Sequence, residues 1–152
     1  MIQDCMKRNV VSIPATTTLG ETARLFVARH VGLLPVVDEN GRPIGMIGLR
    51  DMLALALPSF INLIADVDFV HDFGAVESAQ PAPEILSRPI TAVMRAAITI
   101  PENCGLLRAY AMMRQHDLHD IPVVSADGRL VGIASRVDVA TAFLAGWEAA
   151  KP

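Results

Sequence analysis

The sequence is short of cysteine, of aromatic side chains and of positive charge. It has 152 residues, of which 2 are cysteines and 5% are aromatic, and its formal net charge is −3 at pH 7. Cys5 and Cys104 show neither a metal-ligand nor a redox spacing, and no signal-peptide pattern is visible, so we expect free thiols in a reducing cytoplasm. Without an excess of basic residues, the chain lacks the electrostatic footprint of a protein that binds nucleic acid or an anionic membrane surface.

Long apolar runs and catalytic motifs are also missing. The most apolar stretch, residues 52–65, is interrupted by Pro58 and Asn62 and falls short of the ~20 residues that a membrane-spanning helix needs. We therefore expect no membrane insertion and interpret this stretch as a buried or interface helix. No phosphate-binding loop with its lysine, no Gly-x-Ser-x-Gly elbow and no pair of catalytic carboxylates occurs, so nothing in the sequence assembles an enzyme.

What the chain does contain is an internal repeat. The sequence Leu-Leu-Pro-Val-Val at 33–37 returns as Asp-Ile-Pro-Val-Val at 120–124, and Gly45 and Asp51 return at the same offset as Gly132 and Asp138. A chain of this length makes one domain, or two half-domains that cannot bury a core separately. Two copies of one unit usually build one object with an internal two-fold axis, and we expect a ligand-binding cleft between them.

Both copies predict the order strand, helix, strand, strand, helix. In the first copy, Thr18 and Glu21 have the spacing of a capping box, and the helical pattern that follows stops near Gly32. Asn40 and Gly41 both accept positive φ and predict a tight hairpin turn. The expected strands are 10–14, 34–37, 44–47, 97–100, 121–124 and 130–134, and the expected helices are 19–30, 52–57, 106–115 and 137–147.

We divide the chain into a first repeat at 1–57, an insert or linker at 58–87 and a second repeat at 88–152, which together form one composite α/β (α+β) domain. The insert has no counterpart in the repeat. It begins with a candidate helix at 59–73 and ends in a proline-rich linker. Residues 90–94 echo residues 4–6, one residue out of register with the main offset.

The repeated pattern resembles a tandem pair of cystathionine-β-synthase-type (CBS) domains. The resemblance is carried by the Pro-Val-Val strand, the Asn-Gly or Asp-Gly hairpin, the glycine that leads the third strand (Gly45 or Gly132) and the aspartate six residues later. It implies two β-α-β-β-α repeats about a pseudo-two-fold axis, with the sheets packed together and the helices outside. It also implies clefts that bind an adenosine-containing ligand such as AMP, ADP, ATP or S-adenosylmethionine, with no separate cofactor. Such modules regulate a partner protein, commonly form homodimers and are not themselves enzymes.

The best candidate for the ligand site is the segment from Ser135 to Asp138, which resembles the ribose-phosphate motif of the family. An ionised Asp138 only accepts hydrogen bonds, and its two oxygens suit the two hydroxyls of a ribose. The Ser135 hydroxyl and the amides that open the next helix favour a phosphate, and Arg136 could add a charge-assisted bond. The same Ser-x-x-Asp spacing is also close to that of a capping box, which needs no ligand.

The resemblance points to further residues of this site. It places the adenine slot at Thr99, Ile100, Ile121 and Pro122, and a basic residue near the phosphates at His119. For Ile100, an ordinary place in the core is an equally good interpretation. The neighbouring Asp120 would repel a polyphosphate, which favours AMP, adenosine or S-adenosylmethionine over ATP.

The first copy departs from the pattern, because Gly48 stands where the second copy has Ser135. This exchange keeps the aspartate and loses the hydroxyl, so we expect the cleft of the first copy to be the weaker or the empty one. Its candidate residues are Asp51, Gly48, Ser12, Ile13, Leu34 and Pro35.

Two alternatives to a ligand sensor stay open at this point. One is an interaction or dimerisation scaffold without a ligand, which would use residues 52–73 as an exposed apolar surface. Trp147, which has no counterpart in the first copy, could cover a dimer seam or a helix of the insert, or could simply pack within its own repeat. The other is a metal-binding protein that uses His116 and His119, although a closed zinc site needs about four ligands.

Overall fold

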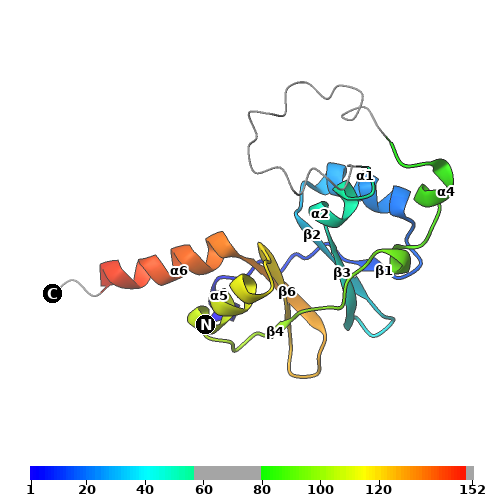
Figure 1. The fold of residues 1–152 in the computed structure, drawn as a ribbon. Coiled ribbons are helices and arrows are strands. Elements are labelled where there is room, and N and C mark those ends of the chain that lie inside the picture. Colours follow the sequence, from blue (N-terminus) through cyan, green and yellow to red (C-terminus); the bar gives the residue numbers. More distant parts are fainter. Residues whose placement is uncertain (57–79, 150–152) are drawn as a thin grey trace, which may run out of the picture.

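The computed structural model describes residues 1–56 and 80–149, which form two similar halves (Figure 1). The elements of the first half are η1 (Ile2–Asp4), β1 (Ile13–Pro14), α1 (Leu19–Arg29), β2 (Leu33–Val37), β3 (Pro43–Gly48) and α2 (Leu49–Leu53). Those of the second half are α4 (Pro83–Leu86), η4 (Ile90–Ala92), β4 (Ile100–Pro101), α5 (Leu106–Gln115), β5 (Asp120–Val124), β6 (Leu130–Ser135) and α6 (Arg136–Ala149).

Each half contains one three-stranded mixed sheet, in the order β1-β2-β3 or β4-β5-β6. In both sheets the short first strand runs parallel to the Pro-Val-Val strand, which pairs antiparallel with the strand that contains the repeated glycine. The register is also repeated, since Val36 pairs with Gly45 and Val123 pairs with Gly132. The predicted α/β class and the two related repeats are confirmed.

The helix α1 begins where the sequence predicts. The backbone N–H of Glu21 donates to Thr18 Oγ1 at 3.2 Å, and the N–H of Thr18 donates to Glu21 Oε2 at 2.9 Å, which is the predicted capping box. The helix ends earlier than predicted, because His30 adopts a left-handed conformation with φ of 53° and its N–H closes the last turn on the Phe26 carbonyl. The predicted stop at Gly32 is therefore wrong.

The hairpin turn of the first half differs from the predicted one. Gly41 has a positive φ of 76°, as its counterpart Gly128 does at 82°, but Asn40 does not. The Asp38 side chain holds the turn instead, because its Oδ1 accepts the N–H groups of Asn40 and Arg42, both at 2.9 Å. An aspartate that bonds to the backbone two residues ahead makes the tight two-residue turn unnecessary.

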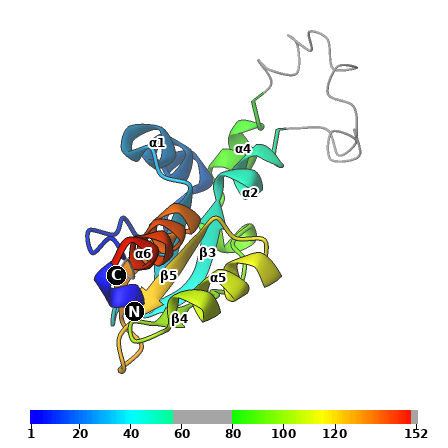
Figure 2. The same cartoon turned by 90° about the vertical axis from the view of Figure 1, so that its left-hand side faces the viewer.

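The first few residues of each half pack into the core of the other half. Ile2 and Met6 belong to the core of the second half, where the Ile2 N–H donates to the Cys104 carbonyl at 2.9 Å. Ile90 belongs to the core of the first half, where its N–H donates to the Thr17 carbonyl at 2.7 Å. Figures 1 and 2 accordingly show the N-terminus lying against the second half. Neither repeat therefore has a complete core of its own.

The remaining boundaries differ by a few residues. The strands expected at 10–14 and 97–100 shorten to β1 and β4, so residues 10–12 and 97–99 are extended chain outside the sheets. The helices expected at 52–57 and 137–147 begin sooner, as α2 and α6, directly at the ends of β3 and β6. The candidate helix at 59–73 lies outside the described residues.

Candidate ligand-binding clefts

Two clefts lie where the halves meet. The Ser135 cleft has a volume of about 250 Å³ and is lined by Lys7, Asn9, Val10, Val11, His30, Val31, Gly32, Leu33, Asp120, Ile133, Ser135 and Asp138. The Gly48 cleft has a volume of about 290 Å³ and is lined by Gly32, Leu33, Gly48, Leu49, Arg50, Arg95, Asp117, Leu118, His119 and Asp120. Three residues line both clefts, so the two spaces lie on either side of a shared wall.

Each cleft takes part of its wall from a segment that crosses over from the other half. Lys7 pairs with Ile133 of β6 through two backbone hydrogen bonds of 2.9 Å. Arg95 pairs in the same way with Met46 of β3, at 2.9 and 3.0 Å. The crossing needs a glycine beneath it, because a Cβ added at Gly132 would overlap the Met6 sulfur and lie 3.1 Å from the Lys7 carbonyl oxygen. The two repeats therefore build both clefts together.

Ser135 and Asp138 bond to each other at the start of α6. The N–H and the hydroxyl of Ser135 donate to Asp138 Oδ2 at 2.9 and 2.7 Å, and the Asp138 N–H donates to Ser135 Oγ at 3.0 Å. This is the geometry of a capping box, which satisfies amides at the helix start. Both donors use the same carboxylate oxygen, and among the described residues Oδ1 of Asp138 has no hydrogen-bond partner. The capping role thus leaves one oxygen for a ligand.

In the Gly48 cleft the equivalent aspartate is engaged by an arginine. Asp51 Oδ2 accepts the Gly48 N–H at 2.8 Å and Arg95 Nε at 3.1 Å. Arg95 belongs to the crossing segment, so this ion pair links the two halves. A Cβ added at Gly48 would come no closer than 3.5 Å to any neighbouring atom, which means that the backbone here has room for a serine.

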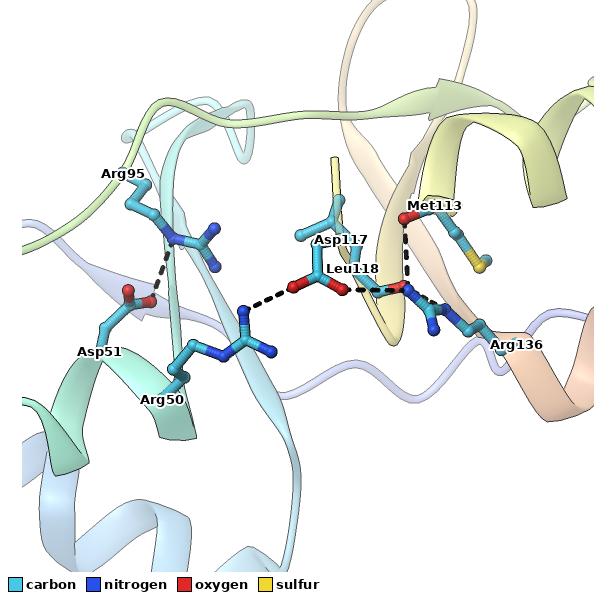
Figure 3. Close-up of polar contacts among 7 residues, drawn as sticks. All are labelled: Arg50, Asp51, Arg95, Met113, Asp117, Leu118 and Arg136. Carbon is cyan, nitrogen blue, oxygen red and sulfur yellow. Dashed lines mark hydrogen bonds and ion pairs between the residues drawn. The ribbon is translucent and has the colours of Figure 1, made fainter. Parts of the chain in front are cut away.

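A second group of charges crosses the mouth of the Gly48 cleft (Figure 3). Arg50 Nη1 lies 2.6 Å from Asp117 Oδ2, and Arg136 Nη2 lies 3.5 Å from Asp117 Oδ1. The hydrogen bond from Arg50 holds the pKa of the Asp117 carboxyl below its ordinary value and raises the pKa of Arg50. Arg136 is held at the end of α5, because its Nε donates to the Leu118 carbonyl at 2.7 Å. It does not line the Ser135 cleft, where the sequence suggested a bond to phosphate.

Asp120 stands in the wall that the clefts share. Burial raises the pKa of its carboxyl, Lys7 and His119 oppose that shift, and Asp138 adds to it. Its Oδ2 lies 3.0 Å from the place where a Cβ on Gly32 would be, so the glycine leaves room for the carboxylate. A negative charge on Asp120 faces any ligand in either cleft.

The residues proposed for the adenine slot lie elsewhere. Ile100 and Ile121 are 2% and 0% exposed and belong to the core of the second half, and Pro122 is buried in β5. Thr99 is half-buried in the extended chain before β4 and does not line the Ser135 cleft. His119 lines the Gly48 cleft, not the Ser135 cleft.

The candidates of the first copy are also dispersed. Leu34 and Pro35 are buried in β2, and Ser12 and Ile13 line a separate groove beside β1. Gly48 lines the cleft named after it, with Asp51 bonded to its N–H. The residues that sequence reasoning missed are those of the crossing segments and of the turns after α1 and α5, namely Lys7, Val10, Val11, His30, Arg95 and Asp117. The sequence shows only that residues 4–6 and 90–94 echo each other, which does not indicate that these segments cross to the other half.

Two absences concern other kinds of site. Within residues 1–56 and 80–149, no three His, Cys, Asp or Glu side chains gather in a way that could hold a metal ion, so His116 and His119 find no third ligand there. No helix in the described part of the chain is long and apolar enough to cross a membrane.

The CBS domain model matches the chain over residues 2–57 and 85–145. The chain is 28% identical over 134 residues to the uncharacterized protein MJ1404 of Methanocaldococcus jannaschii, and the matched region covers 88% of this chain and 30% of that relative. It is 26% identical over 148 residues to the chloroplastic CBS domain-containing protein CBSX2 of Arabidopsis thaliana, and the matched region covers 91% of this chain and 60% of that relative. The chain thus spans less than two thirds of the length of these relatives.

Two solved structures share the fold. CBSX2 in complex with AMP superposes with a TM-score of 0.70 at 23% identity, over 96% of this chain and 97% of that one. The CBS domain pair of MJ0100, in complex with 5′-methylthioadenosine and S-adenosylmethionine, superposes with a TM-score of 0.68 at 19% identity, over 96% of this chain and 97% of that one. Since the family model matches both repeats and the folds agree over nearly the whole chain, this protein belongs to the CBS domain family and is a tandem CBS domain pair.

Proposed function

We propose that the chain is a regulatory module without catalytic activity, which binds an adenosine-containing ligand in the Ser135 cleft and thereby controls a partner protein. The observation that carries this proposal is the composition of that cleft, in which Ser135 and Asp138 of one repeat face the crossing segment of the other. A ligand that contacts both repeats favours one arrangement of them. It can shift a partner only as far as its affinity differs between arrangements.

The chemistry of the cleft suits a nucleoside. The unpartnered Oδ1 of Asp138 can accept a ribose hydroxyl while Oδ2 keeps its bonds to Ser135. Val10, Val11 and Ile133 supply apolar side chains for the faces of a base. The positive end of the α6 dipole lies beside Ser135 and favours a group with partial negative charge there, although the amides of Arg136 and Asp138 are already bonded to the His119 carbonyl and to Ser135 Oγ.

The charges of the cleft favour a ligand with few phosphates. Lys7 and His30 stand against Asp120 and Asp138, so the lining carries no clear excess of positive charge. A triphosphate would meet two carboxylates, whereas AMP or the cationic S-adenosylmethionine would not be penalised to the same degree. Among the ligands considered, we therefore place AMP and S-adenosylmethionine before ADP and ATP. CBSX2 was crystallised with AMP, and the MJ0100 pair with S-adenosylmethionine.

A thermal-shift and calorimetric panel of AMP, ADP, ATP and S-adenosylmethionine tests this proposal. Ligand at 100 times its dissociation constant stabilises the fold by about 2.7 kcal/mol, which in a chain of this size raises the Tm by roughly 5–10 °C. Asp138→Ala should abolish the shift that AMP or S-adenosylmethionine gives. Asp51→Ala is the matched control, because it removes the equivalent aspartate from the other cleft and should leave the shift in place. No shift from any ligand at millimolar concentration would favour the scaffold alternative.

We further propose that the module works as a homodimer through the outer face of α5 and α6. This face carries an apolar groove of about 300 Å³ lined by Leu106, Leu107, Tyr110, Val139, Ala140, Phe143, Leu144 and Trp147. Trp147 is 64% exposed and meets Phe143 edge to face at 6.0 Å between ring centres. A face without a charged residue in its lining suits a second copy of itself, since a two-fold contact brings like surfaces together. Light scattering should give the dimer mass for the parent chain and the monomer mass for Trp147→Glu.

A further inference from the structure

The two clefts differ at a pair of equivalent positions near their mouths. Asp117 and His30 follow α5 and α1 at the same place in the repeat, and both adopt the left-handed conformation, with φ of 51° and 53°. Opposite Asp117 stands Arg50, whereas the repeat places Val137 at the position equivalent to Arg50. The Gly48 cleft therefore has an ion pair between these two positions. In the Ser135 cleft His30 belongs to the lining, whereas Val137 is 69% exposed and does not.

The Arg50–Asp117 pair joins the two repeats. Arg50 belongs to the first repeat, at the start of α2, and Asp117 belongs to the second. Asp117 is fixed on its own side by the long contact with Arg136, whose guanidinium is bonded to the Leu118 carbonyl. The pair is 72% and 65% exposed, so water and salt weaken it and a competing anion can replace the carboxylate.

We propose that Asp117 is a tethered competitor that occupies Arg50 until an anionic ligand enters the Gly48 cleft and takes its place. This inference deepens the proposed function and rests on it for the identity of the nucleotide. Arg50 and Arg95 both line the Gly48 cleft, and each is held by a carboxylate, Asp117 or Asp51. A phosphate group can offer two oxygens to a guanidinium, whereas Asp117 contacts Arg50 through Oδ2 and Arg136 through Oδ1. When a phosphate takes Arg50, the ion pair between the repeats is broken, and the arrangement of the repeats responds to the ligand's charge.

The two clefts would then divide the ligand chemistry between them. The Ser135 cleft has no such competitor and two carboxylates in its lining, so it suits a ligand with little negative charge. The Gly48 cleft sets two guanidinium groups, Arg50 and Arg95, against the carboxylates of Asp117 and Asp120, and it suits a phosphate group once Asp117 has moved off Arg50. Its lack of a serine is then less important than the displacement of Asp117.

Asp117→Asn tests the proposal with little disturbance of the backbone, because asparagine is the residue that best tolerates the left-handed conformation after glycine. The probes are inorganic pyrophosphate, AMP and adenosine, titrated calorimetrically at low and at physiological salt. Asp127→Asn is the matched control, since it removes an exposed aspartate that is paired with Arg129 at the far hairpin. It changes the net charge equally.

We expect Asp117→Asn to bind pyrophosphate about twofold to fivefold more tightly than the parent chain, the range that an exposed ion pair is worth. Asp127→Asn should bind pyrophosphate with the affinity of the parent chain. Adenosine should bind the parent chain and both variants with equal affinity. Adding Arg50→Gln to Asp117→Asn should abolish the increase in affinity for pyrophosphate. Unchanged or weaker binding of pyrophosphate by Asp117→Asn, or no binding by either chain at millimolar concentration, would overturn the proposal.

The outcome is separable from that of the proposed function. If Asp138→Ala abolishes the binding of AMP while Asp117→Asn leaves the affinity for pyrophosphate unchanged, the adenosine-sensor proposal is supported and the proposed role of Asp117 is wrong. If Asp117→Asn binds pyrophosphate more tightly while no adenosine compound binds the parent chain, Asp117 competes with anions for Arg50 as proposed and the adenosine-sensor proposal is wrong.

Discussion

Replacing Gly132 with alanine should destabilise the chain by forcing the crossing segment off β6. The added methyl would overlap the Met6 sulfur and lie 3.1 Å from the Lys7 carbonyl oxygen. That carbonyl accepts the Ile133 N–H at 2.9 Å and cannot retreat without losing the bond, and Met6 is only 8% exposed. Overpacking of a well-filled core costs about 1–3 kcal/mol. In a chain of this size this loss lowers the Tm by roughly 2–12 °C.

Urea unfolding followed by circular dichroism, with the slope m compared between variants, measures this cost. Gly146→Ala is the matched control, because nothing lies within 4 Å of a Cβ at that position of α6, and alanine there should stabilise by about 0.5–1 kcal/mol. The double variant Met6→Ala/Gly132→Ala should lose less than the sum of the single losses, since the shorter side chain removes one of the two clashes. A Gly132→Ala chain as stable as the parent would refute the account of how the repeats cross.

Three further predictions concern the core, the shared wall and the Gly48 cleft. Ile90→Ala should lower the free energy of unfolding by about 2–5 kcal/mol in a denaturant titration, because Ile90 is 0% exposed in the core of the first repeat. Asp120→Asn should raise the Tm at neutral pH: burial raises the pKa of the folded carboxyl, so its favourable contribution is present below the ordinary value near 3.9 and is lost as the pH rises through the folded pKa. Melting curves of the two chains should therefore converge at low pH, and a gap that widens there would contradict the assignment. Gly48→Ser should add the missing hydroxyl beside Asp51 and stabilise the start of α2 by a few tenths of a kcal/mol. In a thermal melt the Tm of this variant should therefore equal or slightly exceed that of the parent chain.

The sequence predicted the repeated unit well because each signal is local. The capping box at Thr18 and Glu21, the helix at 106–115 and the Pro-Val-Val strands each depend on residues within a few positions of one another. The offset of the repeat then fixed how many units there are. The predicted turn at Asn40 failed for an equally local reason, since the Asp38 side chain competes for the same backbone groups.

The clefts were harder to predict because they depend on which repeat each wall comes from. The family resemblance placed Thr99, Ile100 and Ile121 in the same cleft as Ser135, although the repeat itself predicted a cleft between the two copies. The structure instead brings Lys7, Val10 and Val11 to Ser135, because the chain before β1 crosses to β6. The sequence shows only that the segments at 4–6 and 90–94 echo each other, one residue out of register. A slip of register does not say which strand the segment reaches.

The role of Arg136 shows a second limit. Its place beside Ser135 in the sequence suggested a bond to phosphate, but successive residues at a helix start point in different directions. The side chain instead reaches back to the carbonyl of Leu118, just after α5, at 2.7 Å, and to that of Met113 in its last turn, at 3.5 Å. Adjacent residues in the sequence can thus serve different neighbours, and only the packing of α6 against α5 decides between them.

The central claim is that one ligand is held by both repeats at once, and amide chemical shifts in a titration of the ¹⁵N-labelled chain with AMP test it most directly. The account predicts that the amides of Ser135 and Asp138 move together with those of Val10 and Val11, with one saturation curve. It also predicts that Asp138→Ala removes the response of both groups. Shifts confined to one repeat, or no saturable shift at millimolar AMP and S-adenosylmethionine, would contradict it.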